Sequence, residues 1–221
     1  MSSVTALGLV AGAYLLGSVS FSVVLVRVLH GLDVRTVGSG NAGATNAMRA
    51  AGKKAGAAVL VLDVIKGVTA VAVPRALEAP LSVVGGAAVA VVLGHVFPIF
   101  FGFRGGKGVA TAAGALGTLA PVAMALGLLA FAAVVLWKRY VSLASIVTAA
   151  LFPFLVALGP RLGWTAYGGP WLVLPAAGIA LLIVFKHRRN LQRLWRGTEP
   201  RLGERRRKPA GDKPAGEMTG G

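Results

Sequence analysis

The chain has 221 residues, of which 56% are hydrophobic and 14% charged, with a mean hydropathy of +0.75. Soluble domains carry about 25% charged residues, so this composition excludes a soluble protein and predicts a polytopic membrane protein. The net charge is +16, but most Lys and Arg residues lie between or after the apolar stretches, which is typical of topology signals and lipid contact and argues against nucleic acid as a partner.

Six apolar stretches are candidates for membrane helices, since a helix needs roughly 20 apolar residues to cross the hydrocarbon core. They are Val4 to Leu29, Ala55 to Val73, Leu81 to Phe101, Val109 to Trp137, Val141 to Leu158 and Trp171 to Phe185. The first lacks the basic leader and cleavage site of a signal peptide, so we expect a membrane helix. The fourth is interrupted by Gly114, Gly117 and Pro121, so we expect it to form two helices, each short for a bilayer.

This division gives an all-α fold with seven transmembrane helices, and the basic residues predict their orientation. Residues 30–54, 102–108 and 186 onward are rich in Lys and Arg, whereas residues 74–80 and 159–170 are poor in them. The positive-inside rule therefore predicts an N-terminus outside and a cytoplasmic C-terminus. We expect one integral membrane domain, residues 1–200, followed by a basic, disordered cytoplasmic tail, residues 201–221, that contacts anionic lipid.

The first polar cluster lies between the first two apolar stretches. It runs from Gly38 to Asn46 and combines glycines, which permit tight turns, with four residues that favour helix caps. The glycines are Gly38, Gly40 and Gly43, and the cap-forming residues are Ser39, Asn41, Thr45 and Asn46. We expect a helix to begin near Ala42 and to carry Arg49 on its first turns. Backbone amides and a guanidinium would then form a phosphate or carboxylate site. From this segment alone, an ordinary polar turn is an equally good interpretation.

The second polar cluster, Gly105, Gly106, Lys107 and Gly108, directly precedes the apolar stretch that begins at Val109. It differs from a nucleotide-binding P-loop, because glycine stands where Ser or Thr would hold magnesium. The pattern indicates an anion-binding loop and implies neither a metal nor a nucleotide.

The third polar cluster is His187-Arg188-Arg189-Asn190, which follows the last apolar stretch. Its predicted membrane face is the same as that of the two glycine-rich loops, so we interpret His187 and Asn190 as donors to an anion. Ser142 and Ser145 would also lie at this face, but serine is common in membrane helices and is weak evidence for a site.

Asp63 and Lys66 are three residues apart within an apolar stretch, on one face of the expected helix. Ionisable side chains in a membrane are paired or face a polar cavity. We favour a structural ion pair over direct chemistry. His95, at the end of the next stretch, has two open interpretations, a hydrogen-bonded structural residue or a reactive one.

A nucleophilic or acid–base catalytic group is hard to find in this sequence. The chain has no cysteine, which excludes thiol nucleophiles and thiolate metal sites. None of the histidines begins a His-x-x-x-x-Asp motif, and the chain has only 7 acidic residues. If the protein is an enzyme, its catalysis must come mainly from positioning and from positive charge directed at developing negative charge.

Taken together, four segments resemble the bacterial acyl-phosphate:glycerol-3-phosphate acyltransferases, the PlsY family. The segments are Gly38 to Asn46 with Arg49, Leu62 to Gly67, Gly94 to Pro98 leading to Gly105 to Thr111, and His187 to Asn190 with Gly197 to Pro200. The similarity runs in order from about Gly17 to Arg201. One departure is Gly17-Ser18-Val19-Ser20, where the family usually has Gly-Ser-x-Pro, so the proline of an expected helix kink is missing.

The resemblance implies a multi-pass enzyme of the bacterial inner membrane whose active site faces the cytoplasm. Such an enzyme transfers a fatty acyl group from acyl phosphate to the 1-hydroxyl of glycerol 3-phosphate. The products are lysophosphatidic acid and phosphate, in the first acylation step of phospholipid synthesis. Its partners would be these two substrates and the lipid bilayer, with no cofactor, and we expect a monomer.

The resemblance also implies the site residues. The catalytic set is Ser39, Arg49, Lys107, His187 and Asn190, and the substrate-binding set is Gly38, Gly40, Asn41, Thr45, Asn46, Gly105, Gly106, Gly108, Ser142 and His95. Lys107 and Arg49 would hold phosphate groups, and the glycine amides would brace the acyl phosphate. His187 and Asn190 would orient glycerol phosphate, whose attacking hydroxyl would lose its proton to a substrate phosphate.

Two other functions fit the same residues. A transporter or channel for an organic phosphate would also direct helix starts at an anion, but it needs access from both membrane faces, whereas the polar clusters are predicted on one. A membrane scaffold that binds acidic lipid through its basic tail would depend on the tail and not on the glycine-rich loops.

Overall fold

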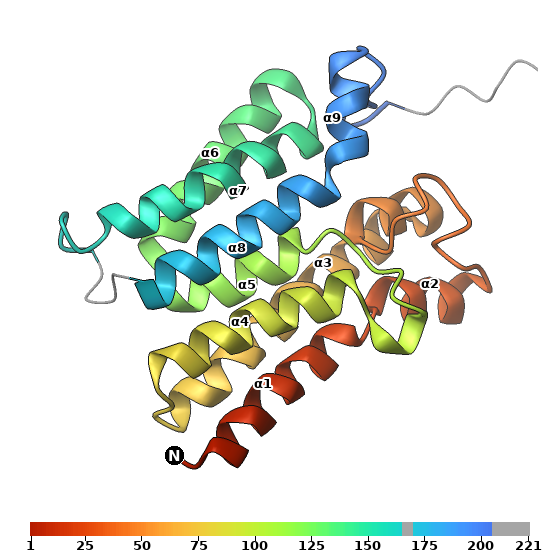
Figure 1. Cartoon of the computed structure of the whole chain (residues 1–221). Coiled ribbons are helices and arrows are strands. Elements are labelled where there is room, and N and C mark those ends of the chain that lie inside the picture. Colours follow the sequence, from red (N-terminus) through yellow and green to blue (C-terminus); the bar gives the residue numbers. More distant parts are fainter. Residues whose placement is uncertain (165–169, 205–221) are drawn as a thin grey trace, which may run out of the picture.

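The computed structural model describes residues 1–164 and 170–204, and every regular element in these ranges is a helix. The elements are α1 (Ser3–Ser18), α2 (Phe21–His30), α3 (Ala44–Ala76), α4 (Leu81–Val96), the 3-10 helix η1 (Ile99–Phe101), α5 (Val109–Leu119), α6 (Pro121–Lys138), α7 (Val141–Leu158), α8 (Pro170–Lys186) and α9 (Arg188–Trp195). The long helices lie side by side in one bundle (Figure 1). The predicted tail lies outside the described residues from position 205 onward.

Five helical segments are long and apolar enough to cross a membrane: Ser3–His30, Ala44–Ala76, Leu81–Phe101, Pro121–Lys138 and Val141–Leu158. A sixth candidate is α8 together with α9, which are bent by 55° at their junction. The all-helical membrane fold expected from the sequence is thus confirmed, with five or six candidate spans by length and composition in the described ranges.

The predicted break in the fourth apolar stretch is present. Helix α5 ends at Leu119, and α6 begins at Pro121, where proline suits the first helical position. Helix α5 has 11 residues, about 16 Å at 1.5 Å per residue. It is short for a hydrocarbon core of about 30 Å, and it packs against α3.

Glycines let two pairs of helices approach closely. A Cβ atom on Gly17 of α1 or on Gly94 of α4 would collide with a backbone carbonyl of the other helix. Gly67 of α3 and Gly114 of α5 form the same kind of reciprocal contact. Close backbone approach of this kind is how membrane helices gain packing contacts without a hydrophobic driving force.

The first apolar stretch is broken between α1 and α2 although Ser20 replaces the proline usual in the family. Lys66 of α3 donates from Nζ to the carbonyl oxygens of Gly17 at 3.1 Å and Val19 at 2.9 Å. These carbonyls lie at the C-terminal end of α1, where backbone carbonyls have no N–H donor within the helix. Lys66 also pairs with Asp63 at 2.9 Å. The buried pair therefore anchors the break between α1 and α2, as a structural ion pair would.

Candidate active site

The three polar clusters converge at the end of the bundle opposite the N-terminus (Figure 1). The loop before α3, the loop before α5 and the segment around α9 meet there. Two contacts demonstrate this convergence: a Cβ on Gly106 would lie 2.8 Å from the Ala42 carbonyl oxygen, and Lys107 donates to Asn190. Residues far apart in the sequence thus form one polar region at one end of an apolar helical body.

Asn46 organises the first loop. Its Nδ2 donates to the carbonyl oxygens of Val34 at 2.7 Å and Val37 at 2.9 Å, and its Oδ1 accepts from the Ser39 amide at 2.9 Å. Gly38, with φ +62°, lies directly against this Oδ1 and leaves no room for a Cβ. Asn46 is buried, so its amide group folds the loop.

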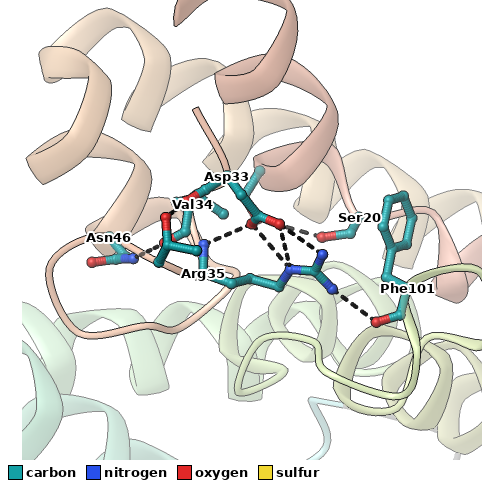
Figure 2. Close-up of polar contacts among 8 residues, drawn as sticks. Ser20, Asp33, Val34, Arg35, Asn46 and Phe101 are labelled. Carbon is teal, nitrogen blue, oxygen red and sulfur yellow. Dashed lines mark hydrogen bonds and ion pairs between the residues drawn. The ribbon is translucent and has the colours of Figure 1, made fainter. Parts of the chain in front are cut away.

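Arg35 joins the first loop to η1, the 3-10 helix that precedes the second loop. Its guanidinium pairs with Asp33 at 2.7 Å and donates from Nη1 to the Phe101 carbonyl oxygen at 2.9 Å, as Figure 2 shows. The hydrogen bonds from Arg35 hold the pKa of the Asp33 carboxyl below its ordinary value. Arg35 therefore ties the two loops together, a role that the sequence analysis did not assign.

The remaining residues of the first cluster differ in exposure. Gly38, Ser39, Gly40 and Arg49 are exposed, whereas Asn41 and Thr45 are partly buried. Helix α3 begins at Ala44, two residues after the predicted start, and Arg49 precedes a break at Gly52, whose φ is +86°. The charge of Arg49 lowers the pKa of Lys107, which places this guanidinium within electrostatic range of the second loop.

The second loop requires glycine for space and for conformation. The Gly106 amide donates to the His95 carbonyl oxygen at 3.1 Å, and a Cβ on Gly105 or Gly106 would collide with His95. Gly108 precedes α5 with φ +84°. The His95 ring is buried, with Nδ1 3.5 Å from Asp63 Oδ1. His95 therefore packs against the second loop and supports its conformation.

A chain of hydrogen bonds connects Lys107 to the last polar cluster. Lys107 Nζ donates to Asn190 Oδ1, and Asn190 Nδ2 donates to Glu199 Oε1 at 2.6 Å. Glu199 also accepts from Ser142 Oγ at 2.7 Å and from Arg193 Nε at 2.7 Å. Helices α7 and α9 and the two flanking loops thus fix the direction of the Lys107 ammonium group.

Lys107 and Glu199 have shifted pKa values. Burial lowers the pKa of Lys107 to about 8, against the opposing charge of Glu199 and with the support of the nearby cations Arg193, Arg49 and Lys186. Burial disfavours the Glu199 carboxylate, but hydrogen bonds from its three donors outweigh this and hold its pKa below the ordinary value. At neutral pH the site therefore contains a charged ammonium group oriented by a charged carboxylate.

His187 lies between α8 and α9 and is buried. Its Nδ1 is 2.8 Å from the Ile183 carbonyl oxygen, so this nitrogen carries the proton, because a carbonyl can only accept. Burial and the charge of Lys107 lower the pKa of His187 to about 4. In a neutral ring protonated on Nδ1, the other nitrogen, Nε2, is an acceptor and suits a hydroxyl group better than a phosphate oxygen.

The contacts of Glu199 and Arg193 were not predicted from the sequence. Glu199 is one of only 7 acidic residues in the chain, and a rare carboxylate near basic clusters was the available signal. Ser142 bonds to this carboxylate, whereas Ser145 donates to the Val141 carbonyl oxygen of its own helix. Within residues 1–164 and 170–204, no three His, Cys, Asp or Glu side chains are placed to bind a metal ion.

This arrangement suits a phosphorylated ligand at the end of an apolar helical body. Cationic groups on two other segments lie within electrostatic range of the Lys107 ammonium group, and this group is held in a defined direction. Charge-assisted hydrogen bonds from such groups are the strong contacts that phosphate oxygens make in proteins.

Comparison with known proteins gives a consistent set of relatives. Residues 7–197 match the family model described as glycerol-3-phosphate acyltransferase. A glycerol-3-phosphate acyltransferase from Vibrio cholerae is 45% identical over 94% of this chain and 95% of its own length. One from Halalkalibacterium halodurans is 44% identical over 90% of this chain and 96% of its own length.

Solved structures agree with the sequence relatives. The glycerol 3-phosphate form of PlsY (YgiH), an integral membrane glycerol 3-phosphate acyltransferase, has a TM-score of 0.81 and 41% identity, and covers 90% of this chain and 96% of the other. Its lysophosphatidic acid form has a TM-score of 0.78 and 38% identity over the same shares.

Proposed function

Since the chain belongs to the glycerol-3-phosphate acyltransferase family, we propose that it acylates the 1-hydroxyl of glycerol 3-phosphate with acyl phosphate as donor. The observation that carries this proposal is the Lys107 ammonium group, directed by Asn190 and Glu199 and flanked by Arg49. Both proposed substrates bear a phosphate, and both need positive charge at the membrane surface.

The proposed reaction balances without a cofactor. The 1-hydroxyl oxygen attacks the acyl carbonyl carbon, the bond from this carbon to the phosphate oxygen breaks, and the hydroxyl proton moves to the departing phosphate. Lysophosphatidic acid and inorganic phosphate result. Positive charge favours this step because negative charge develops on the carbonyl and phosphate oxygens in the transition state.

Lys107 and Arg49 supply this charge in the proposal, and Ser39 and the glycine-rich loops surround the phosphates. Asn190 acts as a positioning residue, because both ends of its side-chain amide are used, one by Lys107 and one by Glu199. The Gly106 amide is bound to the His95 carbonyl, so the other amides of this loop are the ones available to brace the acyl phosphate.

His187 orients the attacking hydroxyl in this proposal, with Nε2 as the acceptor. A base with a pKa of about 4 is too weak to remove the proton of an alcohol efficiently, since a general base works best with a pKa near the operating pH. The departing phosphate is the better proton acceptor. This division of roles explains how the reaction proceeds with few carboxylates in the chain.

We also infer seven crossings, with α5 as the short one, and an active site that faces the cytoplasm of a bacterial inner membrane. Four helices, α5 to α8, separate Lys107 from Asn190, so these two residues share a membrane face only if α5 crosses as the other three do. The hydrogen bond from Lys107 Nζ to Asn190 Oδ1 supports this crossing. The basic loops then share one face, as the positive-inside rule requires. We also expect a monomer, which stays a prediction.

The identity of the acyl donor tests the proposal. Purified protein is incubated with glycerol 3-phosphate and, separately, a fatty acyl phosphate or the corresponding acyl-coenzyme A thioester, and lysophosphatidic acid and inorganic phosphate are measured. We expect both products in equal amounts from acyl phosphate only. A faster reaction with the thioester would refute the donor assignment. Transport of labelled glycerol 3-phosphate into vesicles without acylation would favour the transporter.

A further inference from the structure

Helix α9 has two faces with different surroundings. Its inner face carries Asn190 and Arg193, which bind Glu199. Its outer face is exposed along the whole helix, and Trp195 is 91% exposed. Tryptophan is enriched at membrane interfaces, so a Trp side chain this exposed at the end of a membrane bundle suits a position at the lipid headgroups.

The outer face combines an apolar and a basic side. Leu191 and Trp195 are four residues apart and share one side, while Arg189 and Arg196 are seven apart and share the other. Arg188 lies between the apolar and the basic side, and all five side chains are exposed. An amphipathic helix with Trp on one side and Arg on the other is typical of the interface between hydrocarbon and phospholipid headgroups.

The lipid-facing surface of α8 leads directly to this outer face. Leu174, Leu181 and Phe185 lie on one side of α8, at spacings of seven and four, and are 67%, 73% and 57% exposed. The Arg188 guanidinium lies 4.6 Å from the centre of the Phe185 ring. The bend of 55° between α8 and α9 turns the chain at this point, as Figure 1 shows.

We propose that the outer face of α9 docks on anionic phospholipid headgroups of the bilayer in which the chain is embedded, and that this contact fixes the position of Asn190 and through it Lys107. The first part follows from the apolar and basic sides of α9 and their continuity with the lipid-facing surface of α8. The second part rests on the proposed function, because it makes turnover sensitive to membrane charge.

The docking itself is measured without any activity assay. The chain has no cysteine, so Gln192→Cys on the exposed face supplies a single thiol for an environment-sensitive fluorophore. The labelled full-length chain is placed in vesicles of phosphatidylcholine alone or of an equimolar mixture with phosphatidylglycerol. We expect emission at shorter wavelength in the anionic vesicles, since the label then enters the interface.

Charge removal identifies the residues responsible. Arg188→Gln, Arg189→Gln and Arg196→Gln together should abolish the difference in emission, because each arginine near an anionic surface strengthens docking roughly fivefold and three on the order of a hundredfold. A matched control removes three exposed charges elsewhere at the same end, two from α3 and one from the second loop: Lys53→Gln, Lys54→Gln and Arg104→Gln. This control should keep the lipid response.

Four outcomes decide the proposal. The same emission wavelength in both kinds of vesicle would overturn docking through α9. Loss of the lipid-dependent emission shift to the same extent in both triple variants would also overturn it. A lipid-dependent emission with the same rate of acylation in both vesicles would support docking and refute its link to Asn190. A lipid-dependent emission in a protein that acylates nothing would support docking and contradict the proposed function.

Discussion

Because burial lowers the pKa of Lys107 to about 8, the rate of the proposed reaction should fall in mildly alkaline solution. About 90% of free enzyme carries the Lys107 charge at pH 7, and only about 10% at pH 9. If the charged form alone binds phosphate productively, kcat/KM for glycerol 3-phosphate should fall roughly tenfold per pH unit above pH 8. An ordinary lysine, with a pKa of about 10.4, would maintain activity to beyond pH 10.

The assay is a pH profile of lysophosphatidic acid formation at low glycerol 3-phosphate, corrected for spontaneous hydrolysis of acyl phosphate. The Lys107→Arg variant is the control, because a guanidinium keeps its charge throughout this range. We expect a lower maximal kcat/KM in this variant, because a guanidinium cannot reproduce the hydrogen bond from the compact ammonium group to Asn190. We also expect its kcat/KM not to decline near pH 8. A wild-type profile that stays flat to pH 10, or a decline shared by Lys107→Arg, would refute the reasoning.

Other substitutions test separate parts of the structure. Glu199→Gln should lower kcat/KM roughly ten- to a hundredfold in a folded protein, since an amide NH2 would face one of the three donors of this carboxylate; full activity would contradict this role. Gly17→Ala should lower the melting temperature by several degrees, at a cost of about 1–3 kcal/mol, because the added methyl group meets a backbone carbonyl of α4. Gly12 has open space around it, so Gly12→Ala should leave the melting temperature unchanged. Equal melting temperatures of the two variants would refute the close packing. Lys66→Met should destabilise the fold by about 3–5 kcal/mol, because the buried Asp63 carboxylate loses its ammonium partner and keeps only the His95 ring, 3.5 Å away; Asp63→Asn in the same chain should restore most of this stability. Failure of the second change to help would show that the bonds of Lys66 to the break between α1 and α2 matter more.

Helix-breaking residues made part of the fold predictable. Gly114, Gly117 and Pro121 predicted the division that separates α5 from α6, because their effect on a helix is local. The break between α1 and α2 could not be predicted in the same way, because the proline expected there is missing. The break is instead anchored by Lys66, a residue of another helix. A contact between helices of this kind leaves no local pattern in the sequence.

The polar clusters predicted which residues of the candidate site meet, since Lys107 and Asn190, which were expected on one membrane face, form a hydrogen bond. The sequence did not reveal that Glu199 connects them. Its partners Ser142 and Asn190 are 57 and 9 residues away, so the connection depends on how α7 and α9 pack. Asn46 was expected at a substrate and instead bonds the loop backbone, a distinction that residue type alone does not make.

A comparison of two cations in one loop tests the central claim most directly. Lys107→Ala removes the ammonium group held by Asn190, and Arg104→Ala removes an exposed charge three residues earlier. With acyl phosphate and glycerol 3-phosphate, we expect formation of lysophosphatidic acid to be almost lost in the first variant and nearly unchanged in the second. Full turnover in a Lys107→Ala protein would contradict the account.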